Sequence, residues 1–218
     1  NGEAFLQDLY LIYDSLVSHG DSTTANGKLK DLIRLTETFG FYLFKLDIRQ
    51  ESTRHSHAVH EILQLSGVAD YESLNETERQ QFLSAQISSG LKPDTIESAL
   101  SAETLETLQV FQVMRDMKQE ISHRAFGSYV ISMTHNASHI MEVMYLAYLA
   151  GLVGQNRGEY FCHIEVSPLF ETIEDLSHID DVLSQLLSNE LYQKLLKAAE
   201  NTQEVMLGYS DSCKDGGI

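Results

Sequence analysis

Four short apolar segments of this chain each run into a polar loop, in the order of strand and then helix. The segments lie at residues 44–48, 128–133, 166–170 and 205–207. A strand followed by a helix, repeated along a chain, favours a sheet of parallel strands. The pattern therefore predicts an α/β fold that is predominantly helical, with about four parallel strands and many surrounding helices.

Charged side chains follow these strands where they end. Arg49 lies at the end of the first segment, Glu171 follows the third, and Asp211 and Lys214 follow the fourth. Parallel β/α units bind their ligands at the carboxyl ends of the strands. Carboxylates are suitable ligands for a divalent cation, and an arginine and a lysine attract an anion. These residues predict a site for an anion that is held together with a metal.

The segment that follows Leu207 is the most polar of these loops. Glycines bound a run of two aspartates, two serines and a lysine between Gly208 and Gly217, after the apolar residues 205–207. We interpret 205–207 as a buried strand that delivers these groups at its end. Glycine, serine and aspartate are also ordinary turn residues, so a plain turn remains the alternative for this loop.

Composition restricts the function classes. The chain has 218 residues, 43% of them hydrophobic, and a formal net charge of −17. That charge disfavours nucleic acid and anionic membranes as partners. Cys162 and Cys213 form no metal-binding pattern, and no apolar run reaches the length of a membrane span or resembles a signal peptide. We expect a cytoplasmic protein that contacts neither nucleic acid nor membrane.

Most of the remaining chain shows helical periodicity. It predicts helices over 3–18, 27–39, 52–66, 76–87, 101–122, 139–150, 178–188 and 190–200, with an irregular loop over 88–99. Helix starts are predicted from cap residues, namely Ser52, Asn75, Ser101, Ser138, Ser177 and Asn189. The segment 139–150 is apolar nearly all round, so it should be buried.

Three histidines near the first strand end do not predict a metal site. His55, His57 and His60 do not share one face of a helix. His55 follows the strand end directly, so we keep it as a residue that could contact the active site.

At several of these places the chain resembles phosphoenolpyruvate carboxylase. The similar stretches are LDIRQES (46–52), YVISM (129–133), PLFET (168–172) and QEVMLGYSDSCKDGG (203–217), and the resemblance runs from about Ala25 to the end of the chain. It implies a (β/α)8 barrel enzyme that is several-fold longer than this chain. It also implies a lyase that fixes carbon dioxide, forming oxaloacetate and phosphate from phosphoenolpyruvate and bicarbonate with Mg²⁺ or Mn²⁺, and a homotetrameric full-length enzyme.

The resemblance also implies roles for individual residues. Glu171 and Asp211 match the family's metal ligands, Arg49 matches a residue that binds the substrate phosphate, and Lys214 matches a catalytic residue beside the same centre. Two places depart from the family pattern. Cys213 stands where a small residue is usual, and residues 136–139 replace a turn that usually contains proline.

Part of the family's catalytic machinery has no counterpart in the sequence. The family's catalytic histidine belongs to an earlier strand, and its His-Gly-Arg-Gly-Gly loop lies further downstream. We therefore interpret residues 1–218 as a single fragment of a larger barrel enzyme, with a helical lead-in over about 1–40 and successive strand–helix units over 41–218. We expect the fragment alone to be inactive.

Two other functions remain open at this point. Another metal-dependent barrel enzyme acting on phosphoenolpyruvate or pyruvate would share the pair of metal-binding carboxylates. A non-catalytic, acidic helical module that only binds a partner would need none of them. Loss of Mn²⁺ binding in a Glu171→Ala variant would distinguish an enzyme from such a module.

Overall fold

The computed structural model describes residues 2–67, 70–93 and 97–209 of the chain. They divide into two compact units. The first comprises the chain up to Leu46 together with Asp116–Phe126, and the second comprises Asp47–Arg115 and the chain from Gly127 onward.

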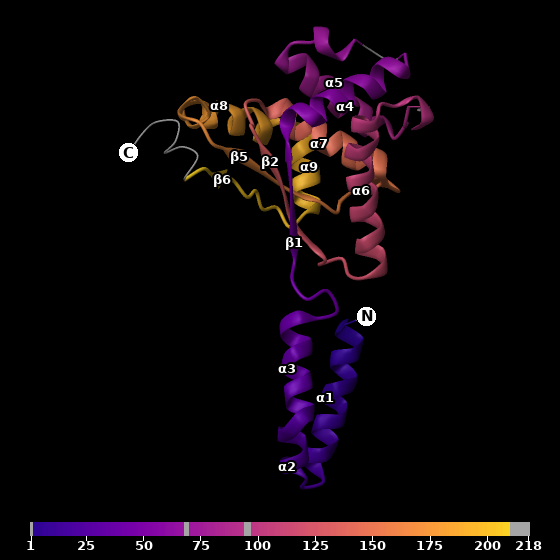
Figure 1. Cartoon of the computed structure of the whole chain (residues 1–218), viewed down its shortest axis with the longest axis vertical. Helices are drawn as coiled ribbons and strands as arrows, with labels where there is room; N and C mark the ends of the chain where they lie inside the picture. The colour runs from indigo at the N-terminus through magenta and orange to yellow at the C-terminus, as the bar shows by residue number, and fades with distance from the viewer. Residues whose placement is uncertain (1, 68–69, 94–96, 210–218) are drawn as a thin grey trace. The chain divides into compact units, whose positions relative to one another are not determined.

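The first unit is built on two helices that lie side by side (Figure 1). These are α1 (Gly2–Ser18) and α3 (Lys30–Phe39), and between them lie the short α2 (Ser22–Thr24) and a π-helical turn, Ala25–Leu29. The Tyr10 hydroxyl donates a hydrogen bond to Glu37 and so joins α1 to α3. The helix predicted over 3–18 is confirmed, whereas the one predicted over 27–39 begins later, because the backbone kinks at Gly27.

The second unit contains a four-stranded sheet in the order β1-β2-β5-β6. The strands are β1 (Leu46–Glu51), β2 (Phe126–Ser132), β5 (Glu165–Phe170) and β6 (Met206–Leu207). β5 pairs in parallel with β2 and with β6, with Ile131 opposite Pro168 and Phe170 opposite Leu207. Figure 1 shows β2 and β5 running side by side. The predicted α/β fold with four strands is confirmed.

One strand differs from its predicted environment. Residues 205–207 were expected to form a buried strand, but β6 is short and its Leu207 is 60% exposed. In the described sheet β6 lies at the edge and pairs only with β5, so no second strand covers it. The central strands β2 and β5 provide the buried part of the sheet instead.

Three helices follow the strands β1, β2 and β5, as predicted: α4 (Ser52–Leu65), α7 (Ala137–Ala150) and α8 (Ile173–Ser188). The other helices are α5 (Glu76–Ser89), α9 (Glu190–Ala198) and α6 (Ala102–Glu120), and the last turn of α6 belongs to the first unit. α7 packs against α4 and α5, and almost all of its residues are buried, which confirms the expectation for 139–150. No helix in the described part of the chain combines the length and the apolar character needed to cross a membrane.

The predicted caps are only partly correct. Asn75 forms a capping box with Glu78, and Asn189 accepts hydrogen bonds from the first turn of α9. Ser177 does not open a helix, because α8 begins earlier, after a capping box between Thr172 and Asp175. Ser52 and Ser138 lie inside their helices, and the hydroxyl of each bonds to a distant segment instead of its own first turn.

A β-hairpin after α7 was not predicted. β3 (Val153–Asn156) and β4 (Glu159–Cys162) pair in antiparallel fashion, and the two residues that join them, Arg157 and Gly158, have φ angles of 51° and 89°. Two successive positive φ angles are typical of a type I′ hairpin turn. Asn-Gly is the strong signal for this turn, and the Arg-Gly pair found here is a weaker one.

Candidate functional site

The carboxyl edge of the sheet brings two of the predicted site residues together. Arg49 Nη2 on β1 donates a hydrogen bond to Glu171 Oε1, directly after β5, at 2.8 Å. The arginine side chain is 54% exposed and the glutamate side chain 13%. β2 lies between β1 and β5 in the sheet, so the pair spans the end of the central strand. Neighbouring strands lie about 4.8 Å apart, and the long arginine side chain covers the additional distance.

The turn after β2 is joined to the start of α4, which follows β1. The Ser52 hydroxyl donates to the Met133 carbonyl oxygen at 2.6 Å, and the Thr134 hydroxyl donates to the Ile131 carbonyl oxygen at 2.8 Å. Met133 has a φ of 55°, a left-handed conformation that is uncommon for a residue with a side chain. The hydroxyl contacts stabilise this turn, one from α4 and one from within the turn itself.

The turn after β5 is fixed by a capping box. The Thr172 amide donates to Asp175 Oδ2 at 3.1 Å, and the Asp175 amide donates to Thr172 Oγ1 at 3.0 Å. Asp175 Oδ1 lies 2.6 Å from Nδ1 of His135, which belongs to the turn after β2. Burial raises the pKa of the Asp175 carboxyl, but the hydrogen bonds from Thr172 and His135 outweigh it and leave that pKa below its usual value. Asp175 is therefore an ionised carboxylate that joins two strand-end turns.

A carboxylate from another helix binds the start of α7. Glu76 on α5 accepts hydrogen bonds from the Ser138 amide at 2.8 Å and from the Ser138 hydroxyl at 2.6 Å. A negative charge is favourable at a helix N-terminus, where backbone amides are otherwise unpaired. Ser138 was expected to cap α7 itself, and this was wrong: its hydroxyl is a donor to Glu76.

The fourth strand ends beside the third. The Gly208 amide donates to the Phe170 carbonyl oxygen at 2.8 Å, so Gly208 lies beside the residue that precedes Glu171. Asp211 and Lys214, the other two predicted site residues, lie outside the described residues, as does Cys213. The structure therefore brings Arg49 and Glu171 together and leaves the other two as predictions.

Known proteins of one family are similar to this chain over its whole length. The family model of phosphoenolpyruvate carboxylase matches residues 1–218. The chain is 39% identical over 226 residues to the phosphoenolpyruvate carboxylase of Rhodothermus marinus, an alignment that covers 100% of this chain and 24% of that protein. It is also 39% identical to the enzyme of Roseiflexus castenholzii over 97% of this chain and 22% of that protein, and 37% identical to the enzyme of Serratia proteamaculans over 100% and 23%.

The chain belongs to the phosphoenolpyruvate carboxylase family. It spans about a quarter of the length of these relatives. Membership of this family sets aside the alternative of a different enzyme family.

One residue that was expected near the site lies in the core. His55 is fully buried in α4, and its Nε2 lies 2.8 Å from the Tyr129 hydroxyl oxygen. Burial lowers the pKa of His55 to about 3, with a further contribution from the charges of His139 and Arg54. The expectation that His55 could contact the active site was wrong, because the helical turn after Ser52 rotates it toward the buried face of α4. Throughout residues 2–67, 70–93 and 97–209, no three His, Cys, Asp or Glu side chains are placed to hold a metal.

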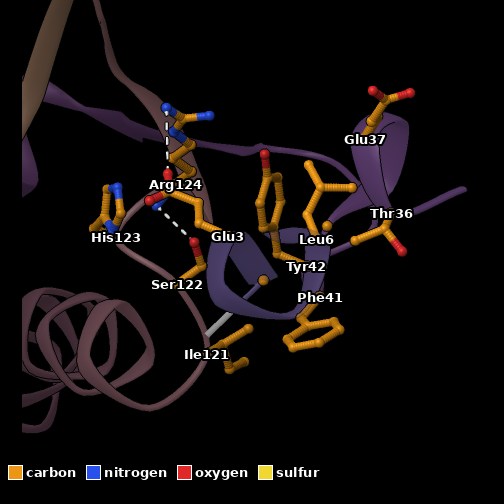
Figure 2. A pocket seen from close by; sticks show the side chains of 12 residues that line it. Glu3, Leu6, Thr36, Glu37, Phe41, Tyr42, Ile121, Ser122, His123 and Arg124 are labelled. Carbon is orange, nitrogen blue, oxygen red and sulfur yellow. Dashed lines mark hydrogen bonds and ion pairs between the residues drawn. The ribbon is translucent and has the colours of Figure 1, made fainter. Parts of the chain in front are cut away.

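A hollow of about 150 Å³ lies in the first unit, and neither Arg49 nor Glu171 lines it. Figure 2 shows Glu3 and Arg124 pointing toward each other across it, at 3.9 Å, beside the aromatic rings of Phe41 and Tyr42. The carboxyl edge of the sheet therefore remains the candidate site.

Sequence reasoning missed Asp175, His135 and Glu76. The spacing Thr172-x-x-Asp175 is a capping-box signal that could have placed the start of α8 and identified Asp175. His135 and Glu76 carry no local signal, since their partners lie 40 and 62 residues away in the sequence.

Proposed function

We propose that this chain forms part of the active site of a phosphoenolpyruvate carboxylase, a lyase that makes oxaloacetate and phosphate from phosphoenolpyruvate and bicarbonate. The observation that carries the proposal is the approach of Arg49 and Glu171 at the carboxyl edge of the sheet, at 2.8 Å. A guanidinium beside a carboxylate at strand ends is suited to bind an anionic substrate next to a cation. Membership of the family supports the same assignment.

Mg²⁺ or Mn²⁺ is the cofactor that this proposal requires. The Glu171 carboxylate offers the hard oxygen donor that such ions prefer, and its low exposure at a strand end fits a metal ligand. Glu171 and Asp211 would hold the ion. When bound, the ion would supply Lewis-acid stabilisation of negative charge that develops on the substrate.

The protein's own groups would position and neutralise the substrate. A guanidinium has five N–H donors, and the contact with Glu171 uses one of them, so Arg49 retains donors for the phosphate of phosphoenolpyruvate. Its positive charge would offset the charge on the phosphoryl group as that group is transferred to bicarbonate. Lys214 would act beside the same group. The assembly that we propose for the intact enzyme is a homotetramer.

The assay for this function measures oxaloacetate formation by the full-length product of the gene that encodes this chain. We expect formation that depends on phosphoenolpyruvate, bicarbonate and a divalent cation, and a loss of at least about a hundredfold in a Glu171→Gln variant. Glu165→Gln is a matched control, because Glu165 is an exposed glutamate at the opposite end of β5. Equal activity of the Glu171→Gln variant and the wild type would contradict the assignment of Glu171. Absence of bicarbonate-dependent product from the wild type would contradict the proposed function itself.

A further inference from the structure

We propose that Asp175 and His135 form a positioning pair that holds Glu171 in the direction required for metal binding. The inference rests on the proposed function of Glu171 and extends it to two residues that do not themselves touch the metal. It concerns the turns after β2 and β5, which the described part of the chain shows in contact with each other.

Asp175 restrains the residue directly after Glu171. Its Oδ2 accepts the Thr172 amide at 3.1 Å, and its own amide donates to the Thr172 hydroxyl at 3.0 Å. On the other side of Glu171, Phe170 is paired with Leu207 in the sheet. Glu171 therefore lies between a residue fixed by strand pairing and a residue fixed by the capping box. With the backbone restrained on both sides, few directions remain for the Glu171 side chain, and the observed one points to Arg49.

His135 fixes Asp175 to a second element. Its Nδ1 lies 2.6 Å from Asp175 Oδ1, and the side chain of Asp175 is only 2% exposed. The His135 amide in turn donates to Nδ1 of His139 in the first turn of α7, at 3.3 Å. Through this chain of contacts, the turn that carries Glu171 is anchored to the turn after β2 and to the start of the buried helix α7.

A capping box that serves only its own helix should not affect metal affinity. Such a box stabilises its helix and leaves ligand affinity unchanged. α5 provides a comparison, because Asn75 and Glu78 form the same two hydrogen bonds, at 3.0 and 2.9 Å, at the start of a helix that does not follow Glu171. Loss of Glu78 and loss of Asp175 should each remove a capping box, and only loss of Asp175 should affect metal binding.

The experiment measures the Mn²⁺ dissociation constant by electron paramagnetic resonance in the full-length gene product. Amide hydrogen exchange of the peptide that contains Thr172 is followed in the same variants. Asp175→Ala and His135→Leu should each weaken Mn²⁺ binding about tenfold, the range found when groups that orient metal ligands are removed. Both should also accelerate exchange at Thr172. His135→Asn keeps an N–H donor near the position of Nδ1, so it should stay within about threefold of the wild type, and Glu78→Ala should match the wild type.

Glu171→Ala is measured in parallel, so that failure of the metal assignment can be distinguished from failure of the positioning pair. If Glu171→Ala abolishes Mn²⁺ binding while Asp175→Ala and His135→Leu bind as the wild type does, the positioning pair is disproved and the proposed function stands. If Glu78→Ala weakens binding as much as Asp175→Ala, the effect is one of general stability and the inference fails. If Glu171→Ala leaves Mn²⁺ binding unchanged, the metal assignment and this inference both fail.

Discussion

Arg49 and Glu171 are separated by 122 residues in the sequence, yet Nη2 of the arginine and Oε1 of the glutamate lie 2.8 Å apart. The contact joins the end of β1 to the turn after β5 across the intervening strand β2. Both residues were predicted from the sequence as members of one site, and their approach is the strongest structural support for it.

This ion pair should matter more for substrate binding than for stability. Arg49 is 54% exposed, so water and salt screen the pair, and a double-mutant cycle of Arg49→Gln with Glu171→Gln should give a coupling of only about 0.5–1 kcal/mol in urea unfolding. The apparent affinity for phosphoenolpyruvate should nevertheless fall about tenfold or more in Arg49→Gln, because a charge-assisted contact to phosphate is lost.

Arg49→Lys is the informative control for this prediction. Lysine keeps the charge but lacks the planar fork of donors, so it should restore only part of the affinity. A coupling energy of several kcal/mol together with unchanged substrate affinity would show that the pair serves the fold instead.

The parts of the fold that local patterns determine could be predicted. Apolar runs placed the four strands, and the uninterrupted apolar character of 139–150 predicted the buried helix α7. Arg49 and Glu171 were found because parallel strands end at a common edge, so adjacency to a strand end carries spatial information.

The parts that depend on distant partners could not be predicted. Glu142 lies fully buried in α7, and the hydroxyls of Ser56 and Tyr71 that bind it lie 86 and 71 residues away in the sequence. His55 shows the opposite error, since it follows a strand end in sequence while helical rotation turns it into the core. Sequence proximity to a site locates a backbone segment but not the direction of a side chain within a helix.

Glu142 should make stability depend on pH. Burial raises the pKa of its carboxyl from 4.5 to about 7, although the hydrogen bonds from Ser56 and Tyr71 and the charge of Arg79 act in the opposite direction. Between these values the folded state keeps a proton that the unfolded state has released, so stability falls as the pH rises. We therefore compare the free energy of unfolding of the wild type with that of Glu142→Gln. The difference between them should be largest in favour of the wild type below pH 4.5, and it should decrease by roughly 3 kcal/mol by pH 7.

Urea unfolding of the two proteins at half-unit steps between pH 4 and 8 measures this difference. Tyr71→Phe removes a donor that favours the ionised carboxylate, so in that background the decrease should continue to higher pH. A difference between wild type and Glu142→Gln that does not change with pH would show that the proton is not retained on folding.

Glu76 should stabilise α7 from outside the helix. Its carboxylate accepts the amide and the hydroxyl of Ser138, which is fully buried, so Glu76→Ala leaves buried donors without a partner. We expect a loss of roughly 1–3 kcal/mol in the free energy of unfolding. Glu174, an exposed acidic residue in the first turn of α8, provides the comparison, and Glu174→Ala should change stability by less than about 0.5 kcal/mol. Equal losses in the two variants, measured by thermal or urea unfolding, would mean that Glu76 acts only through its general charge near a helix end.

We propose that Glu171 and Arg49 belong to one site that binds a divalent cation and phosphoenolpyruvate. A crystal structure of the full-length gene product with Mn²⁺, in which anomalous scattering locates the ion, would test this site. We predict a manganese peak about 2.0–2.6 Å from carboxylate oxygens of both Glu171 and Asp211, which places the two carboxylates within about 5 Å of each other, with the Arg49 guanidinium beside it. A peak bound elsewhere, with Glu171 and Asp211 ordered and pointing away from each other, would contradict the site and the function that we assign to it.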